Sequence, residues 1–179
     1  PPIRPGDGYG PVENPDHQVA QASNPNARGG PFRLTDAAGK PFTDADLADG
    51  LALMTFGYTE CTGACPRTMA AFAAVEDDLS LQSNRPALRY VFVSVDPARD
   101  QAKKLADYQA AAAVKLIALG GTPEEVAKVA ATFGVAYQPQ PKRPDGSYAV
   151  RHSTDMYLVG QPRRSPPGPC SVRSAGRSC

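Results

Sequence analysis

The chain has 179 residues, 41% of them hydrophobic, enough for one globular domain of ordinary size with residues to spare at its ends. Its 19 basic and 18 acidic residues give a formal charge of +1, and no block of one sign indicates a nucleic-acid or anionic-membrane partner. No stretch approaches the ~20 consecutive apolar residues of a membrane-spanning helix. Because the sequence opens Pro-Pro-Ile-Arg and not with methionine, we expect a signal segment or membrane anchor, if there is one, to lie upstream.

The two ends of the sequence differ in composition from its middle. Residues 1–30 are rich in Pro, Gly, Asn and Asp without apolar periodicity, which is typical of an extended arm or linker. Residues 161–179 change abruptly to Arg, Ser, Pro and Gly, and we interpret them as an atypical tail. The folded domain is therefore predicted to span residues 31–160.

In chain order, the first half of this domain predicts a hairpin and then a strand, a loop and a helix. A short helical turn is expected after the hairpin, because Thr43 and Asp46 have the spacing of a capping pair. Pro66 suits the first turn of a helix, where its missing N–H would have no partner. The predicted elements are a hairpin from 31–34 and 41–42, a strand at 51–57, and a helix from Pro66 to Leu79.

The second half continues the alternation of strands and helices. Thr122, Pro123 and Glu125 form a helix-start signal, and Gly134 is a helix end. The predicted elements are a strand at 88–95, a helix at 100–113, a strand at 114–119, a helix from 122 to 134, and strands at 135–138, 147–150 and 155–159. This order predicts an α/β domain with a central mixed sheet, helices on both faces and an N-terminal hairpin extension.

Four cysteines are present, and they are not distributed as a disulfide framework. Cys170 and Cys179 lie in the tail and are interpreted as incidental thiols. Cys61 and Cys65 lie between the strand at 51–57 and the following helix, where the positive end of the helix favours thiolates. From spacing alone, this pair could be a structural bridge, a redox couple, half of a metal site, or two small packed side chains.

Only one histidine, His152, lies in the predicted domain, at the start of the last predicted strand; His17 lies in the arm. Two thiolates and one imidazole suit Cu(I), accept Cu(II) with an added ligand, and also accept zinc. Structural roles, and not functional ones, are expected for several neighbouring residues. Asp96-Pro97 and Arg99-Asp100 are expected to be a strand end and a helix cap, and Phe56 and Tyr58 are expected to pack beside the loop.

Four segments in order resemble the Sco/SenC family: Phe-Gly-Tyr-Thr-Glu-Cys-Thr-Gly-Ala-Cys-Pro at 56–66, Ser-Val-Asp-Pro-Ala-Arg-Asp at 94–100, Gly-Gly-Thr-Pro-Glu-Glu at 120–125, and His-Ser-Thr-Asp-Met-Tyr-Leu at 152–158. The resemblance implies a thioredoxin-like fold that binds one copper ion through Cys61, Cys65 and His152. It also implies a membrane-tethered protein of the periplasm or the mitochondrial intermembrane space. Such proteins help to assemble the copper centre of cytochrome c oxidase, by copper delivery, by thiol reduction of the recipient, or by both. The implied partner is the copper-site subunit of the oxidase or another copper chaperone.

The sequence departs from the family pattern at Glu60, where histidine is common, at Arg151, where an acidic residue is common, and after residue 160, where the family continues with a strand and a helix. If the tail replaces that strand and helix, a strand edge and one face of the sheet are expected to be uncovered. Two hypotheses follow for function. One is a copper chaperone, and the other is a thiol–disulfide oxidoreductase that uses Cys61 and Cys65 without obligatory metal. Whether the protein is an enzyme therefore stays open.

Overall fold

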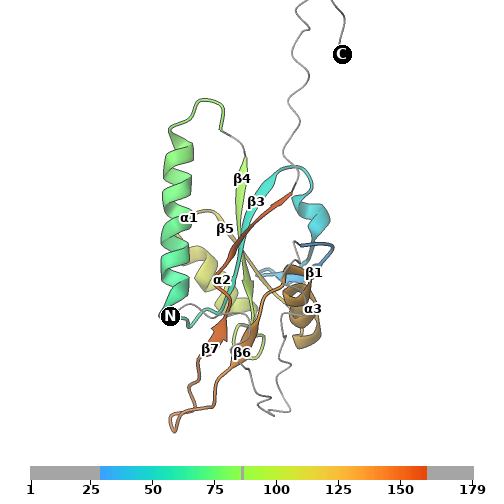
Figure 1. Cartoon of the computed structure of the whole chain (residues 1–179), viewed down its shortest axis with the longest axis vertical. Helices are drawn as coiled ribbons and strands as arrows, with labels where there is room; N and C mark the ends of the chain where they lie inside the picture. The colour runs from blue at the N-terminus through green and yellow to red at the C-terminus, as the bar shows by residue number, and fades with distance from the viewer. Residues whose placement is uncertain (1–28, 86, 161–179) are drawn as a thin grey trace, which may run out of the picture.

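The centre of the fold is a six-stranded mixed sheet, in the strand order β2-β1-β5-β4-β3-β8. The computed structural model describes residues 29–85 and 87–160 (Figure 1). The strands of this sheet are β1 (Arg33–Asp36), β2 (Pro41–Thr43), β3 (Leu51–Gly57), β4 (Leu88–Ser94), β5 (Leu116–Gly120) and β8 (Met156–Gly160). The predicted arm and tail lie outside the described residues, apart from Gly29 and Gly30.

Strands β3, β4 and β5 are parallel, and they are joined by α1 (Ala64–Ser80) and α2 (Ala102–Ala111). Strand β1 is antiparallel to β5, and β8 is antiparallel to β3. The central parallel strands are nearly continuous apolar runs, because helices cover both of their faces. The predicted α/β class and its mixed central sheet are confirmed.

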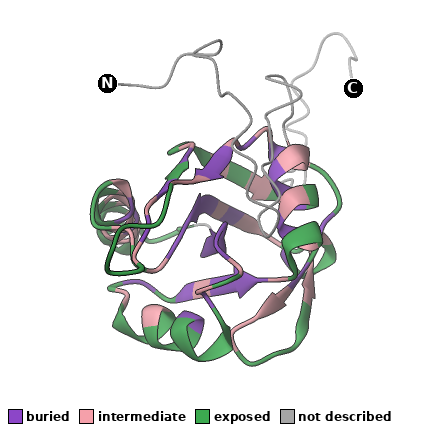
Figure 2. Cartoon of the chain, turned by 90° about the horizontal axis from the view of Figure 1, so that it is seen from below, coloured by how far each residue is buried: buried purple, intermediate pink, exposed green. Residues whose placement is uncertain are grey.

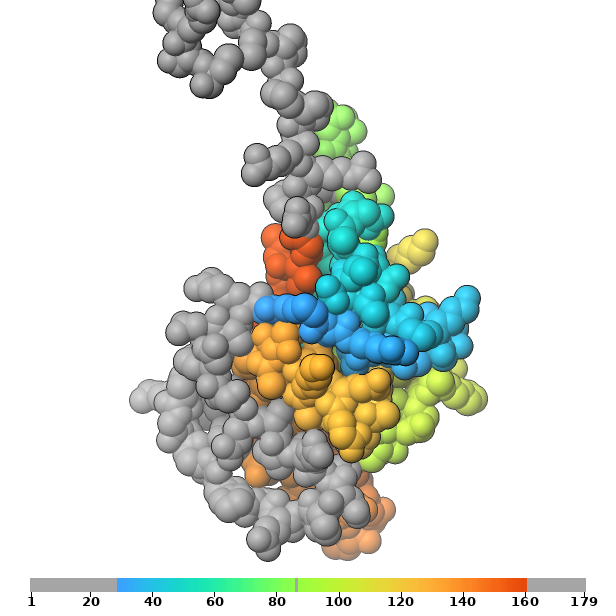
Figure 3. All heavy atoms as spheres, turned by 90° about the vertical axis from the view of Figure 1, so that its right-hand side faces the viewer, coloured from blue at the N-terminus to red at the C-terminus, as the bar shows by residue number. Residues whose placement is uncertain are grey.

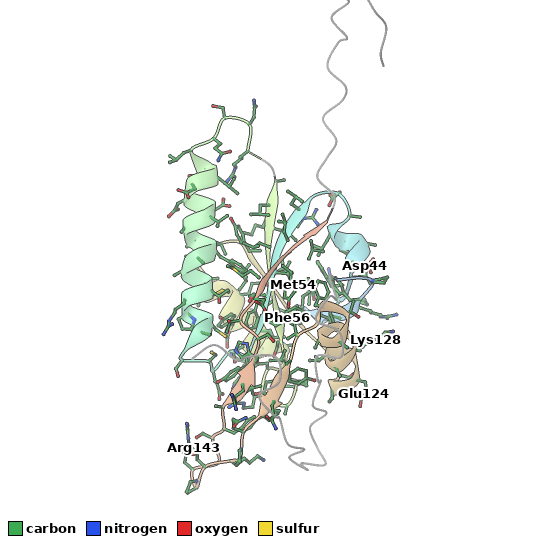
Figure 4. All side chains as sticks on the ribbon, viewed as in Figure 1. Asp44, Met54, Phe56, Glu124, Lys128 and Arg143 are labelled. Atoms are coloured by element: carbon green, nitrogen blue, oxygen red, sulfur yellow. The ribbon has the colours of Figure 1, made fainter. Side chains whose placement is uncertain are left out.

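Alternate residues of each strand belong to different halves of the core. Met54 and Phe56 of β3 face α3 (Pro123–Phe133), which lies to the right of the sheet, whereas α1 lies to the left (Figures 1 and 4). Tyr90 and Phe92 of β4 pack with α1 and α2 on the opposite face. The buried strands consequently lie between helices whose outer surfaces are exposed (Figure 2).

The boundaries of α3 follow its sequence signals. The Thr122 hydroxyl accepts a hydrogen bond from the Glu125 backbone N–H, and the Glu125 carboxylate accepts one from the Thr122 N–H. Gly134 ends the helix with φ +68°, a left-handed conformation that glycine adopts without strain. Thr43 and Asp46 form a second capping box at η1 (Asp44–Leu47). Helix α3 lies against the β1–β2 hairpin (Figure 3).

A separate two-stranded sheet is formed by β6 (Tyr137–Pro139) and β7 (Val150–His152). The predicted strand at 147–150 is wrong, because its first residues continue the long connection between these strands and only Val150 enters β7. His152 ends β7 instead of opening a strand of the central sheet. The predicted turn at 144–146 is confirmed, with Gly146 at φ +80°, and Arg143 marks the outer tip of this β6–β7 hairpin (Figure 4).

Two helices differ from their predicted bounds. Helix α1 begins at Ala64, so Cys65 lies in its first turn, and α2 is shorter than predicted because its N-cap is Gln101. Within the described residues, β8 pairs on one side only, and Met156 and Leu158 on it are 48% and 67% exposed. None of the described helices is long and apolar enough to span a membrane.

Candidate metal centre

The two cysteines lie at the carboxyl end of the parallel strands, which is the usual place for functional sites in open α/β sheets. Strand β3 ends at Gly57, a short loop carries Cys61, and Cys65 follows in the first turn of α1. This local order follows from the sequence, because the apolar run ends in glycine and the helix-forming residues begin only after the loop that carries Cys61. The backbone N–H of Cys65 donates to the Cys61 sulfur over 3.4 Å, so the helix start holds the first thiol.

Gly57 makes room for the second sulfur. A Cβ atom at this position would lie 2.6 Å from the Cys65 Sγ and 2.9 Å from the Phe92 ring, and neither contact is sterically possible. The Cys65 sulfur therefore packs directly against the backbone of β3. From the sequence, Gly57 was predicted only to end a strand; its position directly before the cysteine loop was the available signal for this packing role.

His152 lies on the β6–β7 hairpin, and its side chain is close to both cysteine sulfurs. Its Nε2 atom lies 4.0 Å from the Cys61 Sγ and 3.8 Å from the Cys65 Sγ, and the three ligand atoms lie within 4.8 Å of one another. With metal–sulfur bonds of ~2.3 Å and metal–nitrogen bonds of ~2.0 Å, a trigonal ion separates sulfur from nitrogen by about 3.7 Å. The three residues therefore fit a single metal ion. Both cysteines are free thiols.

The orientation of the His152 ring is fixed on both sides. Its Nδ1 lies 2.8 Å from the Ser153 carbonyl oxygen, which can only accept, so Nδ1 carries a proton and Nε2 is left for the sulfurs or a metal. The Tyr58 ring packs edge-on against the imidazole, with ring centroids 5.9 Å apart. Burial raises the pKa of Tyr58, against a hydrogen bond with the Val150 backbone. Tyr58 thus packs beside the loop, as predicted.

The two thiols differ sharply in acidity. Burial opposes ionisation of Cys61, but the hydrogen bond between Cys61 and His152 and those from the helix start outweigh it and lower its pKa to about 7. Burial raises the pKa of Cys65 to about 12, and its hydrogen bond to the Cys61 sulfur adds to this effect. The prediction that the helix start favours both thiolates is therefore right for Cys61 and wrong for Cys65, which is more deeply buried.

A buried carboxylate, that of Asp100, accepts hydrogen bonds from the cysteine loop and from β4. Asp100 accepts hydrogen bonds from the Thr59 backbone N–H, the Thr59 hydroxyl and the Ser94 hydroxyl at 2.7–2.9 Å. The expected helix-cap role of Asp100 is wrong, because Gln101 occupies the N-cap position of α2. The proximity of Asp96 and Asp100 to the site was not recognised from sequence, since turn chemistry alone explained both residues.

The remaining residues that were singled out in the sequence are not part of the cluster of Cys61, Cys65 and His152. The Glu60 carboxylate pairs with Arg99 and Lys104, so the unusual acid before Cys61 is held by two cations. Arg151 is exposed on β7, next to His152. His17, Cys170 and Cys179 lie outside the described residues.

Fold and site together define a thioredoxin-like protein with a Cys₂His candidate metal site at the carboxyl end of its parallel strands. The profile described as SCO1/SenC matches residues 20–165. The chain therefore belongs to the SCO1/SenC family, as the resemblance of its motifs predicted.

Individual relatives agree with this assignment. The human "Protein SCO1 homolog, mitochondrial" is 39% identical over 132 residues, which are 74% of this chain and 44% of the human protein. The chain thus spans less than half the length of that relative. The crystal structure of Arabidopsis thaliana ScoI with copper bound is 37% identical and has a TM-score of 0.69, covering 74% of this chain and 81% of that one.

A second similar structure is that of BsSco, in which a disulfide switch has been identified and which is a member of the Sco family of cytochrome c oxidase assembly proteins. It is 26% identical, has a TM-score of 0.57, and covers 77% of this chain and 80% of that one. The similar structures therefore include one with copper bound and one of a protein with a disulfide switch.

Proposed function

We propose that this chain binds one copper ion through Cys61, Cys65 and His152 and acts as a copper chaperone. The observation that carries the proposal is the convergence of two sulfurs and one imidazole nitrogen within 4.8 Å of one another. Two soft thiolates with one imidazole form a donor set that suits Cu(I). The copper-bound Arabidopsis relative supports copper over zinc.

The protein residues would each contribute a defined step to copper binding. Cys61 supplies a thiolate near neutral pH, because its pKa is about 7, whereas Cys65 must release its proton when the metal arrives. His152 presents Nε2 because Nδ1 is committed to the Ser153 carbonyl. The bound ion itself would be the cargo passed to a recipient site.

The proposed recipient is a protein, the copper-site subunit of cytochrome c oxidase or another copper chaperone. Membership of the family and the description of BsSco as one of the oxidase assembly proteins support this role. The mitochondrial human relative supports a location facing the intermembrane space, or the periplasm in a bacterium. Attachment to a membrane through an upstream segment is part of the same proposal.

An anaerobic Cu(I) titration of the reduced protein tests the ligand set. We expect one copper ion per wild-type chain and a loss of tight binding in His152→Ala, because two thiolates alone leave the ion under-coordinated. His17→Ala is the matched control, since His17 is the only other histidine in the chain. Unchanged stoichiometry and affinity in His152→Ala would reject this set of ligands.

A second function, thiol–disulfide exchange, is favoured by the difference between the two thiols. The partly exposed Cys61 thiolate would attack a partner disulfide and displace one partner thiolate. Cys65 would then pass its proton to that released thiolate and attack the mixed disulfide as a thiolate. The pair ends oxidised to a disulfide, and the partner ends with two thiols, so two electrons pass to the partner. Cys65→Ser in metal-free protein should trap the mixed disulfide on Cys61, and absence of the trapped species would reject this activity.

A further inference from the structure

One of the three proposed ligands is carried by a part of the fold that is not built into the central sheet. His152 ends β7, and β7 pairs only with β6 within the described residues. The two cysteines, by contrast, follow directly from β3, the strand between β4 and β8. The distance between imidazole and sulfurs therefore depends on what holds the β6–β7 hairpin against the rest of the domain.

Tyr148, four residues before His152, makes polar contacts from this hairpin to the loop after β4. Its hydroxyl donates to the Asp96 Oδ1 over 2.8 Å, and its carbonyl oxygen accepts from the Arg99 Nη1 over 2.8 Å. The Arg99 guanidinium also lies over the Tyr148 ring, 3.7 Å from its centroid. Asp96 and Arg99 bond each other, Nε to Oδ2, over 2.5 Å.

The same arginine reaches the other side of the site. Its Nη1 donates to the Glu60 carboxylate over 2.8 Å, and Glu60 immediately precedes Cys61. The guanidinium lies 5.2 Å from the centroid of the Tyr58 ring, which packs against His152. One side chain from the loop after β4 thus contacts both the segment before the first cysteine and the hairpin that carries the histidine.

We propose that Arg99, together with its partner Asp96, is a positioning residue that sets the distance of His152 from the two cysteines and thereby the affinity for copper. This inference rests on the copper-binding function proposed above. The planar fork of arginine matters, because it bonds a carboxylate, a second carboxylate and a carbonyl at once. Asp96 is only 2% exposed, and a buried ion pair of this kind contributes little net stability, so a role in geometry accounts better for it.

A competing explanation is that apolar packing alone holds the hairpin, since Tyr137, Tyr148 and Val150 belong to the same core cluster as β3. Two variants separate these explanations while keeping the core filled. Arg99→Lys retains the positive charge beside Asp96 but loses the fork. Tyr148→Phe retains the ring and loses only the hydroxyl that bonds Asp96. The matched control is Arg85→Lys, which alters the exposed ion pair of Arg85 with Glu76.

The experiment is a double-mutant cycle on Cu(I) affinity with His152→Ala. We expect Arg99→Lys to weaken binding about tenfold, the lower end for residues that orient metal ligands, and Tyr148→Phe to weaken it several-fold. In the His152→Ala background neither change should have a further effect, because both act through the imidazole. In metal-free Arg99→Lys, the nuclear Overhauser contact between the Tyr58 and His152 rings should weaken, whereas Arg85→Lys should leave it unchanged.

The outcomes distinguish the two proposals. Wild-type affinity in both Arg99→Lys and Tyr148→Phe, or an equal loss with and without His152, would overturn the positioning role while leaving the ligand set intact. If His152→Ala itself binds copper like wild type, the proposed function fails first. If Arg99→Lys does not fold, Tyr148→Phe carries the test by itself.

Discussion

Replacing Gly57 by alanine tests whether the Cys65 sulfur needs the bare backbone of β3. The added Cβ would lie 2.6 Å from that sulfur, and ordinary contact begins near 3.4 Å, so the sulfur must move by about 0.8 Å. Metal–ligand distances in proteins vary by only ~0.2 Å. We therefore expect Cu(I) affinity to fall by at least about tenfold, and the free energy of unfolding to fall by roughly 1–3 kcal/mol from overpacking.

Gly63→Ala is the matched control, because Gly63 lies in the loop that follows β3 and a Cβ atom there meets nothing within 4 Å. Affinity is measured by anaerobic competition with a chromophoric Cu(I) chelator, and stability by urea unfolding of the metal-free protein. The reasoning is refuted if Gly57→Ala binds Cu(I) as tightly as Gly63→Ala does.

Three further predictions concern the two site thiols, the N-cap of α3 and the core. Since the pKa of Cys61 is lowered to about 7 and that of Cys65 is raised to about 12, iodoacetamide should alkylate Cys61 and not Cys65 of the two site thiols in metal-free protein, and this labelling should slow as pH falls through 7; equal labelling of Cys61 and Cys65 at pH 8 would contradict this. Thr122→Ala removes a helix cap and should cost about 1 kcal/mol of unfolding free energy in a urea titration, and no change would mean that the cap is redundant. Phe133→Ala empties a site that is 1% exposed and ringed by Phe32, Phe56 and Tyr157, so it should cost about 3–5 kcal/mol, and a loss below 1 kcal/mol would show that the site collapses.

Sequence reasoning succeeded where the signal is local. The runs at 51–57 and 88–95 became central strands because uninterrupted apolar residues suit strands covered on both faces. Thr122 and Gly134 marked α3 correctly, since caps act through the backbone next to them. The association of His152 with the cysteine pair was suggested by residue type and by the family resemblance.

The features that could not be predicted from the sequence depend on contacts between segments far apart in the chain. Strands β6 and β7 have three residues each, so pairing and not sequence period decides where they begin. The turn chemistry around Asp96 and Arg99 gave no hint that both would contact Tyr148, about 50 residues further along the chain. The opposite acidities of Cys61 and Cys65 follow from depth of burial, which spacing does not reveal.

The proposed metal ligands are far apart in the sequence, and this separation has a consequence for the lifetime of the protein. Cys61 and His152 are 91 positions apart, so an ion bound to both would act as a cross-link that closes a long loop of the chain. Binding energy then adds to folding energy by mass action, and the metal-loaded form resists opening more than the empty one. Susceptibility to proteases would thus report how well the compartment is supplied with metal.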